Sequence, residues 1–396
     1  PIIHNSMGAI VDFDHFDVGK DLDIASWDSY PLGFLLDRIE ASDDYKLTHA
    51  RQGHPDFQAF HHDLYRAVGR GSWWVMEQQP GPVNWAPWNP SPLPGMVRLW
   101  TWEALAHGAE VVSYFRWRQA PFAQEQMHAG LLRPDRAPAE GLLEAQRVAG
   151  ELKNFGEIEI GKAPAALVFD YPSAWAWDIQ PQGRDFSYFG LVFDAYCALR
   201  RAGLSIDIRP PEAGDLGDYK LVLIPGLFSW TEALREQIAG HSGVVMAGPR
   251  SGSKTSDFAI PDRLPPDMDG IDLRVARTES LPPGLSEPFA EGPGRAIKWL
   301  EQLECDARVV LKTEKGAPVL VEQDGTFYLG AWPDTDGWDR VVAILADMAG
   351  LKTEAMTGGL RLRDTETHRF VFNYGPEAQD YDGRMIAVGE LAWWKR

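Results

Sequence analysis

Residues 73–80 read Trp73-Trp74-Val75-Met76-Glu77-Gln78-Gln79-Pro80, an apolar run that ends in a carboxylate. Short apolar runs of this kind suit strands that are buried on both faces of a parallel sheet. Three further runs have the same form and also end in polar or aromatic residues: Pro1–Met7, Leu22–Trp27 and Glu110–Phe115. The four runs predict the strands of an α/β fold whose carboxyl ends carry reactive side chains.

Helical patterns separate these strands. Phe57–Val68 is followed by Gly69, and Met96–His107 is followed by Gly108, which are ordinary helix ends. Long loops after the strands hold the polar and aromatic residues. This is how a (β/α)8 barrel builds its site, at the carboxyl ends of its strands. Four strands make half of such a barrel, and four strands cannot close.

A second α/β pattern begins near Ala163, after a helix predicted over Gly141–Phe155. Alternating strands and helices predict a doubly wound domain that runs to about Leu351. The expected strands are Ala165–Asp170, Ser205–Ile208, Leu221–Ile224, Gly243–Ala247 and late strands within Val319–Gly330. The expected helices are Tyr188–Ala202, Trp230–Gly240 and Trp338–Gly350, and Leu281–Pro293 is expected to be a loop.

The tail favours short antiparallel strands at Arg361–Arg363, His368–Asn373 and Arg384–Val388. We therefore expect three domains, a partial barrel over 1–155, an α/β domain over 156–352 and a small β domain over 353–396. A length of 396 residues is consistent with two or three domains.

Composition excludes several classes of partner. The 38 basic and 57 acidic residues leave a net charge of −19, which argues against nucleic acids and anionic membranes. No apolar run approaches the roughly 18 residues of a membrane span. The two cysteines, Cys197 and Cys305, cannot build a disulfide framework or a cysteine-rich zinc site. A soluble protein with a neutral substrate fits this balance.

The beginning of the chain, Pro1-Ile2-Ile3-His4, carries no visible signal peptide. It resembles the middle of a strand, so we interpret the sequence as the C-terminal part of a longer protein and expect it in the cytoplasm.

Glu77 is the strongest catalytic candidate because it stands at the end of a predicted strand. The following loop, residues 78–94, holds six prolines in seventeen residues, together with Trp85 and Trp88. Proline stiffens a loop, and tryptophan rings stack on sugar faces. A rigid aromatic loop beside a carboxylate predicts a sugar site. The alternative is a carboxylate paired with a neighbouring arginine.

Three more residues could bind substrate. Glu125 and His128 are three residues apart, which places them on one face of a turn or short helix. Tyr30 follows another strand end, where it could orient a carboxylate. A local surface pair is an equally good interpretation of Glu125 and His128, and a simple Tyr-Pro turn is the better one for Tyr30 on sequence alone.

No metal or cofactor site is expected. His61-His62-Asp63 lies on a predicted helix with adjacent histidines, which chelate poorly. Gly248–Thr255 lacks the spacing of a phosphate-binding loop, so we interpret it as a connection.

The sequence resembles the glycoside hydrolase family 42 β-galactosidases. The resemblance is carried by residues 74–85 and by Pro94–Trp100, Ala106–Ala109, Phe115–Gln119, Trp27–Pro31 and Asn5–Gly8. These segments resemble the strand 5 to strand 8 region of the family's barrel. The rest is similar to the amidotransferase-like trimerisation domain and the small β-sandwich domain of that family.

The resemblance implies a role for each candidate. Glu77 falls on the catalytic nucleophile, Tyr30 on the tyrosine near it, and three residues on galactose-binding positions: Trp85, Glu125 and His128. It also implies a homotrimer that hydrolyses terminal β-D-galactosides with retention.

One departure is clear. The family's general acid/base is the glutamate of an Asn-Glu pair after strand 4, and this sequence contains no Asn-Glu pair. The acid/base is therefore expected to be missing from this chain. Two alternatives stay open: a related glycosidase such as an α-L-arabinopyranosidase, or a non-catalytic module for oligomerisation and sugar binding.

Overall fold

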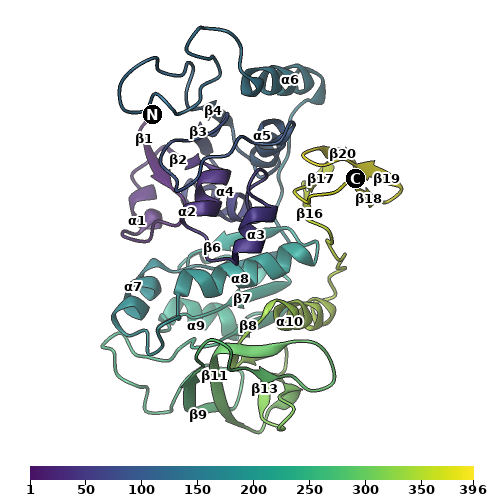
Figure 1. The fold of residues 1–396 in the computed structure, drawn as a ribbon. Coiled ribbons are helices and arrows are strands. Elements are labelled where there is room, and N and C mark those ends of the chain that lie inside the picture. The colour runs from purple at the N-terminus through teal and green to yellow at the C-terminus, as the bar shows by residue number, and fades with distance from the viewer. The chain divides into compact units, whose positions relative to one another are not determined.

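The computed structural model describes all 396 residues and divides into two compact units (Figure 1). Unit 1 comprises residues 1–10, 15–162 and 356–396, and unit 2 comprises residues 11–14 and 163–355. None of the helices has the length and apolar character needed to cross a membrane.

Unit 1 is built on a parallel sheet of four strands in sequence order. The strands are β1 (Ile3–Met7), β2 (Ile24–Ser29), β3 (Trp73–Gln78) and β4 (Val111–Tyr114). All four predicted strands are confirmed, and each boundary lies within two residues of the predicted one. All residues of β2 after Ile24 are buried, whereas in β3 Trp73, Val75 and Gln78 are buried and the residues between them are only half-buried.

Six helices belong to the same unit. They are α1 (His15–Gly19), α2 (Pro31–Asp37), α3 (Asp43–Thr48), α4 (Phe57–Val68), α5 (Met96–Ala106) and α6 (Glu140–Phe155). The predicted bounds of α4 are confirmed, and those of α5 and α6 differ by one residue. Sequence analysis missed α1, α2 and α3, which are five to seven residues long.

The adjacent histidines of α4 pack against the sheet. The Trp27 indole N–H donates to His62 Nδ1 at 3.2 Å, and the His61 ring stacks on Trp27 with centroids 5.0 Å apart. His61 Nε2 also accepts from the Ala9 amide at 2.8 Å. Burial lowers the pKa of His61 to about 3, which keeps its ring neutral. These two histidines are packing partners of Trp27.

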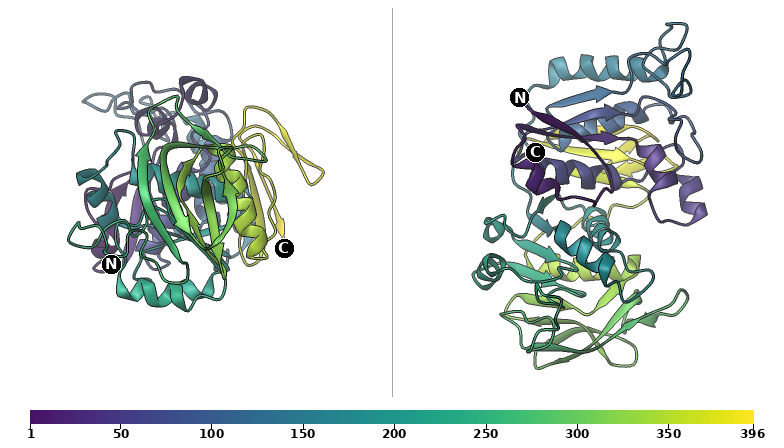
Figure 2. Two further views of the ribbon diagram at one scale, coloured as in Figure 1. Left: turned by 90° about the horizontal axis from the view of Figure 1, so that it is seen from below. Right: turned by 90° about the vertical axis from the view of Figure 1, so that its left-hand side faces the viewer.

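The C-terminal strands complete unit 1. β16 (Leu360–Asp364), β17 (His368–Asn373) and β20 (Leu391–Lys395) form an antiparallel sheet, and β18 (Gln379–Tyr381) pairs with β19 (Arg384–Ile386). The expected tail strands are confirmed, and β18 and β20 add to them. Figure 2 shows these yellow strands beside the helices of the unit. Trp393 stacks on Trp102 of α5 with centroids 4.7 Å apart.

Buried charges fix the C-terminal strands to α4 and the residue before it. Arg361 donates to both oxygens of Asp56, at 2.6 and 2.7 Å. Arg363 lies 3.3 Å from Asp63, which also pairs with His107 at 2.8 Å. Burial works against the charge of Asp63, but His107 and Arg363 hold its pKa well below the ordinary value. Each buried charge therefore has an opposite charge, which is the condition for burying it at tolerable cost.

Unit 2 is a doubly wound α/β domain, as predicted. Its seven-stranded sheet has the order β12-β13-β14-β8-β7-β5-β6. The bounds are β5 (Ala165–Val168), β6 (Ile206–Arg209), β7 (Leu221–Ile224), β8 (Val244–Ala247), β12 (Arg308–Lys312), β13 (Pro318–Gln323) and β14 (Thr326–Leu329). Its helices are α7 (Tyr171–Ile179), α8 (Tyr188–Arg201), α9 (Glu232–Ala239) and α10 (Thr335–Met348), with a short 3₁₀ turn at Leu216–Asp218.

A second sheet of unit 2 was not predicted from the sequence. It contains β9 (Leu273–Ser280), β10 (Glu287–Pro288), β11 (Arg295–Cys305) and β15 (Ala331–Pro333). β9 is largely exposed and charged, so it lacks the apolar run that marks a buried strand. The expected loop over Leu281–Pro293 contains only the two residues of β10.

The segment that begins at Gly248 is a turn after β8, as interpreted. The Arg250 guanidinium lies over the ring of Trp177 at 3.6 Å and over Phe186 and Trp299 at 4.1 Å each. Burial lowers the pKa of Arg250 to about 9. Two amides of this turn already have acceptors, because Gly248 donates to Ser251 Oγ and Arg250 donates to Glu301 Oε1, each at 3.0 Å, whereas a phosphate-binding loop keeps its amides free.

We predict that Arg361→Met destabilises unit 1 by about 3–5 kcal/mol, because Asp56 would keep a buried charge without its partner. Urea unfolding followed by circular dichroism measures the change. Arg133→Met is the matched control, since the Arg133–Asp135 pair is exposed on the surface, and it should leave the midpoint unmoved. Equal midpoints for wild type and Arg361→Met would contradict the role of this pair.

Candidate active site

The register of two strands creates the site. β2 pairs with β3 so that Asp28 is opposite Glu77 and Ser29 is opposite Gln78, after an irregularity at Trp27. Because parallel strands end at the same edge of a sheet, the residues that follow them meet there. Tyr30 continues directly from β2 and reaches the same place.

Tyr30 and Glu77 are hydrogen-bonded to each other. The Tyr30 hydroxyl donates to Glu77 Oε2. Tyr30 is almost fully buried, and burial together with the Glu77 charge raises the pKa of its phenol well above the ordinary value. The phenol therefore stays protonated and serves as a permanent donor. This contact orients one oxygen of Glu77 and leaves the other available.

Asp28 is a second carboxyl beside Glu77, and sequence analysis overlooked it. Its exposed fraction is 6%, and Oδ1 has no hydrogen-bond partner. Burial, with the nearby Glu77 charge, raises the pKa of Asp28 to about 8. The available signal was its position at the end of a predicted strand, two residues before Tyr30.

Trp85 stands over the site on the proline-rich loop. Its ring is 5.7 Å from that of Tyr30, edge to face, and 5.8 Å from that of Phe34. It remains 37% exposed, so one surface of the indole is free for a ligand. Gly33 makes this position possible, because a Cβ there would lie 2.5 Å from Trp85 Cη2.

Gln79 anchors the start of that loop. Its Oε1 accepts from the Leu32 amide at 3.0 Å, and its Nε2 donates to the Gly81 carbonyl at 2.8 Å. The side chain is completely buried. Gln79 thereby ties the loop that carries Trp85 to the start of α2, beside Tyr30.

His128 also faces Tyr30. The two rings meet edge to face with their centroids 5.7 Å apart. The Phe115 ring also meets His128 edge to face, with centroids 5.1 Å apart. His128 is buried, and its Nε2 has no partner. Burial lowers the pKa of His128, so the imidazole is neutral at neutral pH. A neutral Nε2 in this position is suited to a hydrogen bond with a hydroxyl group.

Glu125 lies on the same turn as His128, whose amide donates to the Glu125 carbonyl at 3.0 Å. The Glu125 carboxylate pairs with Arg116, which follows β4 and was not a sequence candidate. The charges of Glu77 and Glu125 both act on Tyr30 and on His128. The five sequence-predicted residues therefore belong to one neighbourhood.

The chemistry of this neighbourhood suits a polyol. Carboxylates, a neutral imidazole and a phenol bind hydroxyl groups, and an exposed indole face suits the apolar face of a sugar ring. Glu77 is joined to Tyr30, Glu125 to Arg116, and Asp28 to Asn5 by a side-chain hydrogen bond.

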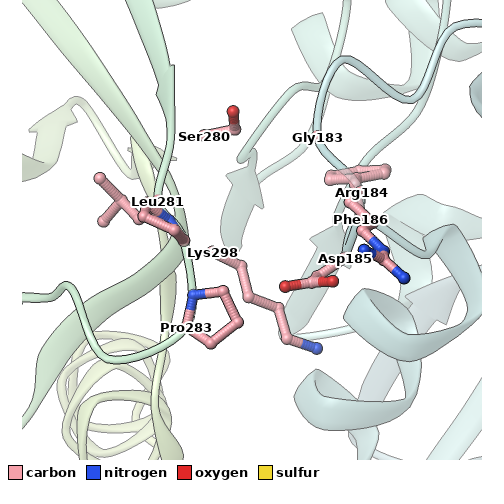
Figure 3. Close-up of a pocket in the computed structure, with 9 residues that line it drawn as sticks. Gly183, Arg184, Asp185, Phe186, Ser280, Leu281, Pro283 and Lys298 are labelled. Atoms are coloured by element: carbon pink, nitrogen blue, oxygen red, sulfur yellow. The ribbon is translucent and has the colours of Figure 1, made fainter.

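A cleft of about 510 Å³ occurs in unit 2 (Figure 3). Asp185 and Lys298 point into it from opposite walls, and Phe186 and Pro283 also line it. None of the sequence-predicted site residues lies in this cleft.

Comparisons with known proteins match the whole chain. A family model described as "Beta-galactosidase" covers residues 1–155, and one described as "Beta-galactosidase trimerisation domain" covers residues 163–352. The chain is 54% identical to a β-galactosidase of Thermus thermophilus over its full length, which is 63% of that protein.

Solved structures agree. The crystal structure of a β-galactosidase from the psychrophilic Marinomonas ef1 has a TM-score of 0.96 at 43% identity, and covers 100% of this chain and 63% of its own. A β-galactosidase from the Antarctic haloarchaeon Halorubrum lacusprofundi has a TM-score of 0.92 at 35% identity, with the same coverage. These matches confirm the predicted fold class, half of a (β/α)8 barrel followed by further domains. The chain spans 63% of the length of these relatives.

We predict that Gly33→Ala displaces Trp85, because the new methyl group would overlap its ring. The 19F resonance of 5-fluorotryptophan at position 85, assigned with Trp85→Phe, should shift. Gly150→Ala is the control, since a Cβ there meets nothing within 4 Å, and it should leave the resonance in place. An unshifted resonance in Gly33→Ala would show that Trp85 does not rest on Gly33.

Proposed function

Because the chain belongs to glycoside hydrolase family 42, the β-galactosidase family, we propose that it carries the nucleophile side of a retaining β-galactosidase site. The observation that supports this most directly is the pair formed by Glu77 and Tyr30. A carboxylate at a strand end, held by a donor that cannot ionise at neutral pH, has the chemistry of a positioned nucleophile.

In the proposed reaction, Glu77 attacks the anomeric carbon of a terminal β-D-galactoside. The bond to the leaving oxygen breaks, and a covalent galactosyl ester forms on Glu77. Water then hydrolyses the ester, and the two inversions give net retention. Tyr30 holds the attacking carboxylate in line, and such positioning is a large part of the rate of a bound reaction.

Galactose binding is assigned to the residues around Glu77. Trp85 offers its exposed ring to the apolar face of the sugar. Glu125 and the Nε2 of His128 offer an acceptor and a neutral nitrogen to its hydroxyl groups. These roles rest on proximity and on the resemblance of the surrounding segments.

The second carboxyl of a retaining enzyme must protonate the leaving oxygen. In such enzymes it lies about 5 Å from the nucleophile, across the scissile bond. The sequence has no Asn-Glu pair, and Asp28 is the cross-strand neighbour of Glu77 in the same sheet, so it does not lie across the scissile bond from Glu77. We propose that no residue of this chain is the general acid/base. Acid catalysis contributes roughly 10²–10⁴-fold, so only good leaving groups should be released quickly.

Unit 2 supports an assembly role, because its family model is a trimerisation domain. We propose a homotrimer, which sedimentation equilibrium would show as three chain masses of 44.2 kDa, whereas a monomer would oppose it. We retain the three-part division at residues 155 and 352, with catalysis in the first part and assembly in the second.

A panel of nitrophenyl glycosides tests the proposal. Wild type should release nitrophenol from the β-D-galactoside and turn over lactose very slowly. Glu77→Gly should lose the activity, and azide should restore it with formation of the α-galactosyl azide, because the small anion attacks in place of the missing carboxylate. Glu157→Ala, an exposed carboxylate, is the control and should behave as wild type.

Faster release from the α-L-arabinopyranoside than from the β-D-galactoside would favour the alternative that the chain is an α-L-arabinopyranosidase. Binding of galactose without release from any member of the panel would favour the non-catalytic module.

A further inference from the structure

A second carboxyl faces Glu77 and has no role in the reaction as described so far. Asp28 is the direct cross-strand partner of Glu77 in the β2–β3 pair. Paired residues of parallel strands point to the same face of a sheet, and so do residues two apart on one strand. Asp28, Tyr30 and Glu77 therefore face one common space.

The groups that act on the Asp28 carboxyl include a second carboxylate and no lysine or arginine. Asn5 of β1 forms a side-chain hydrogen bond with its carboxyl group. Glu77 of β3 faces it, and the phenols of Tyr30 and of Tyr65 on α4 are close enough to feel its charge. Two carboxylates that share a site without a cation cannot both ionise near neutral pH.

The proton belongs on Asp28 rather than on Glu77. Asp28 is 6% exposed and its Oδ1 receives no hydrogen bond, so nothing stabilises a negative charge on that atom. Glu77 accepts from Tyr30, which favours its charged form. The pKa of Asp28, raised to about 8 by burial and by Glu77, agrees with this distribution.

We propose that Asp28 is a positioning residue for Glu77: it holds the single proton of the carboxyl pair and directs it from Oδ1 toward the Glu77 carboxylate. Glu77 is then the only charged member and receives hydrogen bonds from two sides. When Asp28 loses the proton, the donor is lost and two like charges oppose each other, which turns Glu77 away from the anomeric carbon. The positioning role rests on the proposed function. The location of the proton on Asp28 does not depend on it and can be measured without turnover.

The first test therefore needs no activity. Carboxyl 13C NMR of aspartate-labelled protein, assigned with Asp28→Asn, follows the titration of Asp28 in wild type and in Glu77→Gln. The midpoint should be near pH 8 in wild type and clearly lower in Glu77→Gln, because the neighbouring charge is removed. Asp380, an exposed residue, is the control, and its carboxyl signal should be the same in both proteins. A midpoint near pH 4 in wild type, or equal midpoints in the two proteins, would overturn the proposal.

The second test measures positioning through the pH profile of kcat on the activated nitrophenyl galactoside. Wild type should lose rate above about pH 8. Asp28→Ala should lower kcat at pH 7 roughly tenfold to a hundredfold with little change in KM, the cost of a misplaced reacting group. Asp28→Asn keeps a donor that does not titrate, so it should recover much of that loss and abolish the alkaline fall.

Asp28→Asn that retains the alkaline fall, or Asp28→Ala with the wild-type rate, would contradict the positioning role. If Asp28→Ala does not fold, Asp28→Asn and the titration still decide. If wild type releases no nitrophenol at all, the proposed function fails, and the NMR midpoints alone decide where the proton lies.

Discussion

The site depends on the pairing of β2 with β3. This pairing sets Asp28 opposite Glu77 and lets Tyr30, at the next position that faces the same way, donate to the Glu77 carboxylate. A shift of one residue would turn every one of these side chains to the opposite face. Trp27 and Trp73 prevent such a shift, because each is fully enclosed and would have to leave the core.

A series of buried polar groups connects the C-terminal strands to the end of β2. The Tyr374 hydroxyl, just after β17, donates to Glu103 of α5 at 2.5 Å and also lies 3.3 Å from Gln58 Oε1 of α4, and Gln58 Nε2 donates to the Ser29 hydroxyl at 2.9 Å. Ser29 lies between Asp28 and Tyr30. The ion pair between Arg361 and Asp56 holds the C-terminal strands at a nearby point, because Asp56 is two residues before Gln58. The C-terminal strands, far along the sequence, thus support the position of β2 by contacts that are costly to break.

The elements that could be predicted are those whose own residues show an apolar run or a helical pattern. The apolar runs around β2 and β3 and the helix Phe57–Val68 need no distant partner to be recognised, so their positions were predicted closely. β9 was missed because its exposed, charged residues show no core face. Glu77 stood out at a strand end beside a proline-rich loop. Asp28 did not, because its importance comes from the cross-strand register, which a single sequence does not display. Likewise, the pair of Asp56 and Arg361 joins residues 305 positions apart.

Intact mass after incubation with an activated 2-deoxy-2-fluoro-galactoside, followed by peptide mapping, tests most directly whether Glu77 is a positioned nucleophile. The fluorine slows hydrolysis of the ester, and the activated leaving group departs without acid assistance, so the covalent intermediate accumulates. We predict one adduct per chain, located on Glu77. A folded chain that takes up no label, or that carries it on another carboxylate, would show that Glu77 is not the nucleophile.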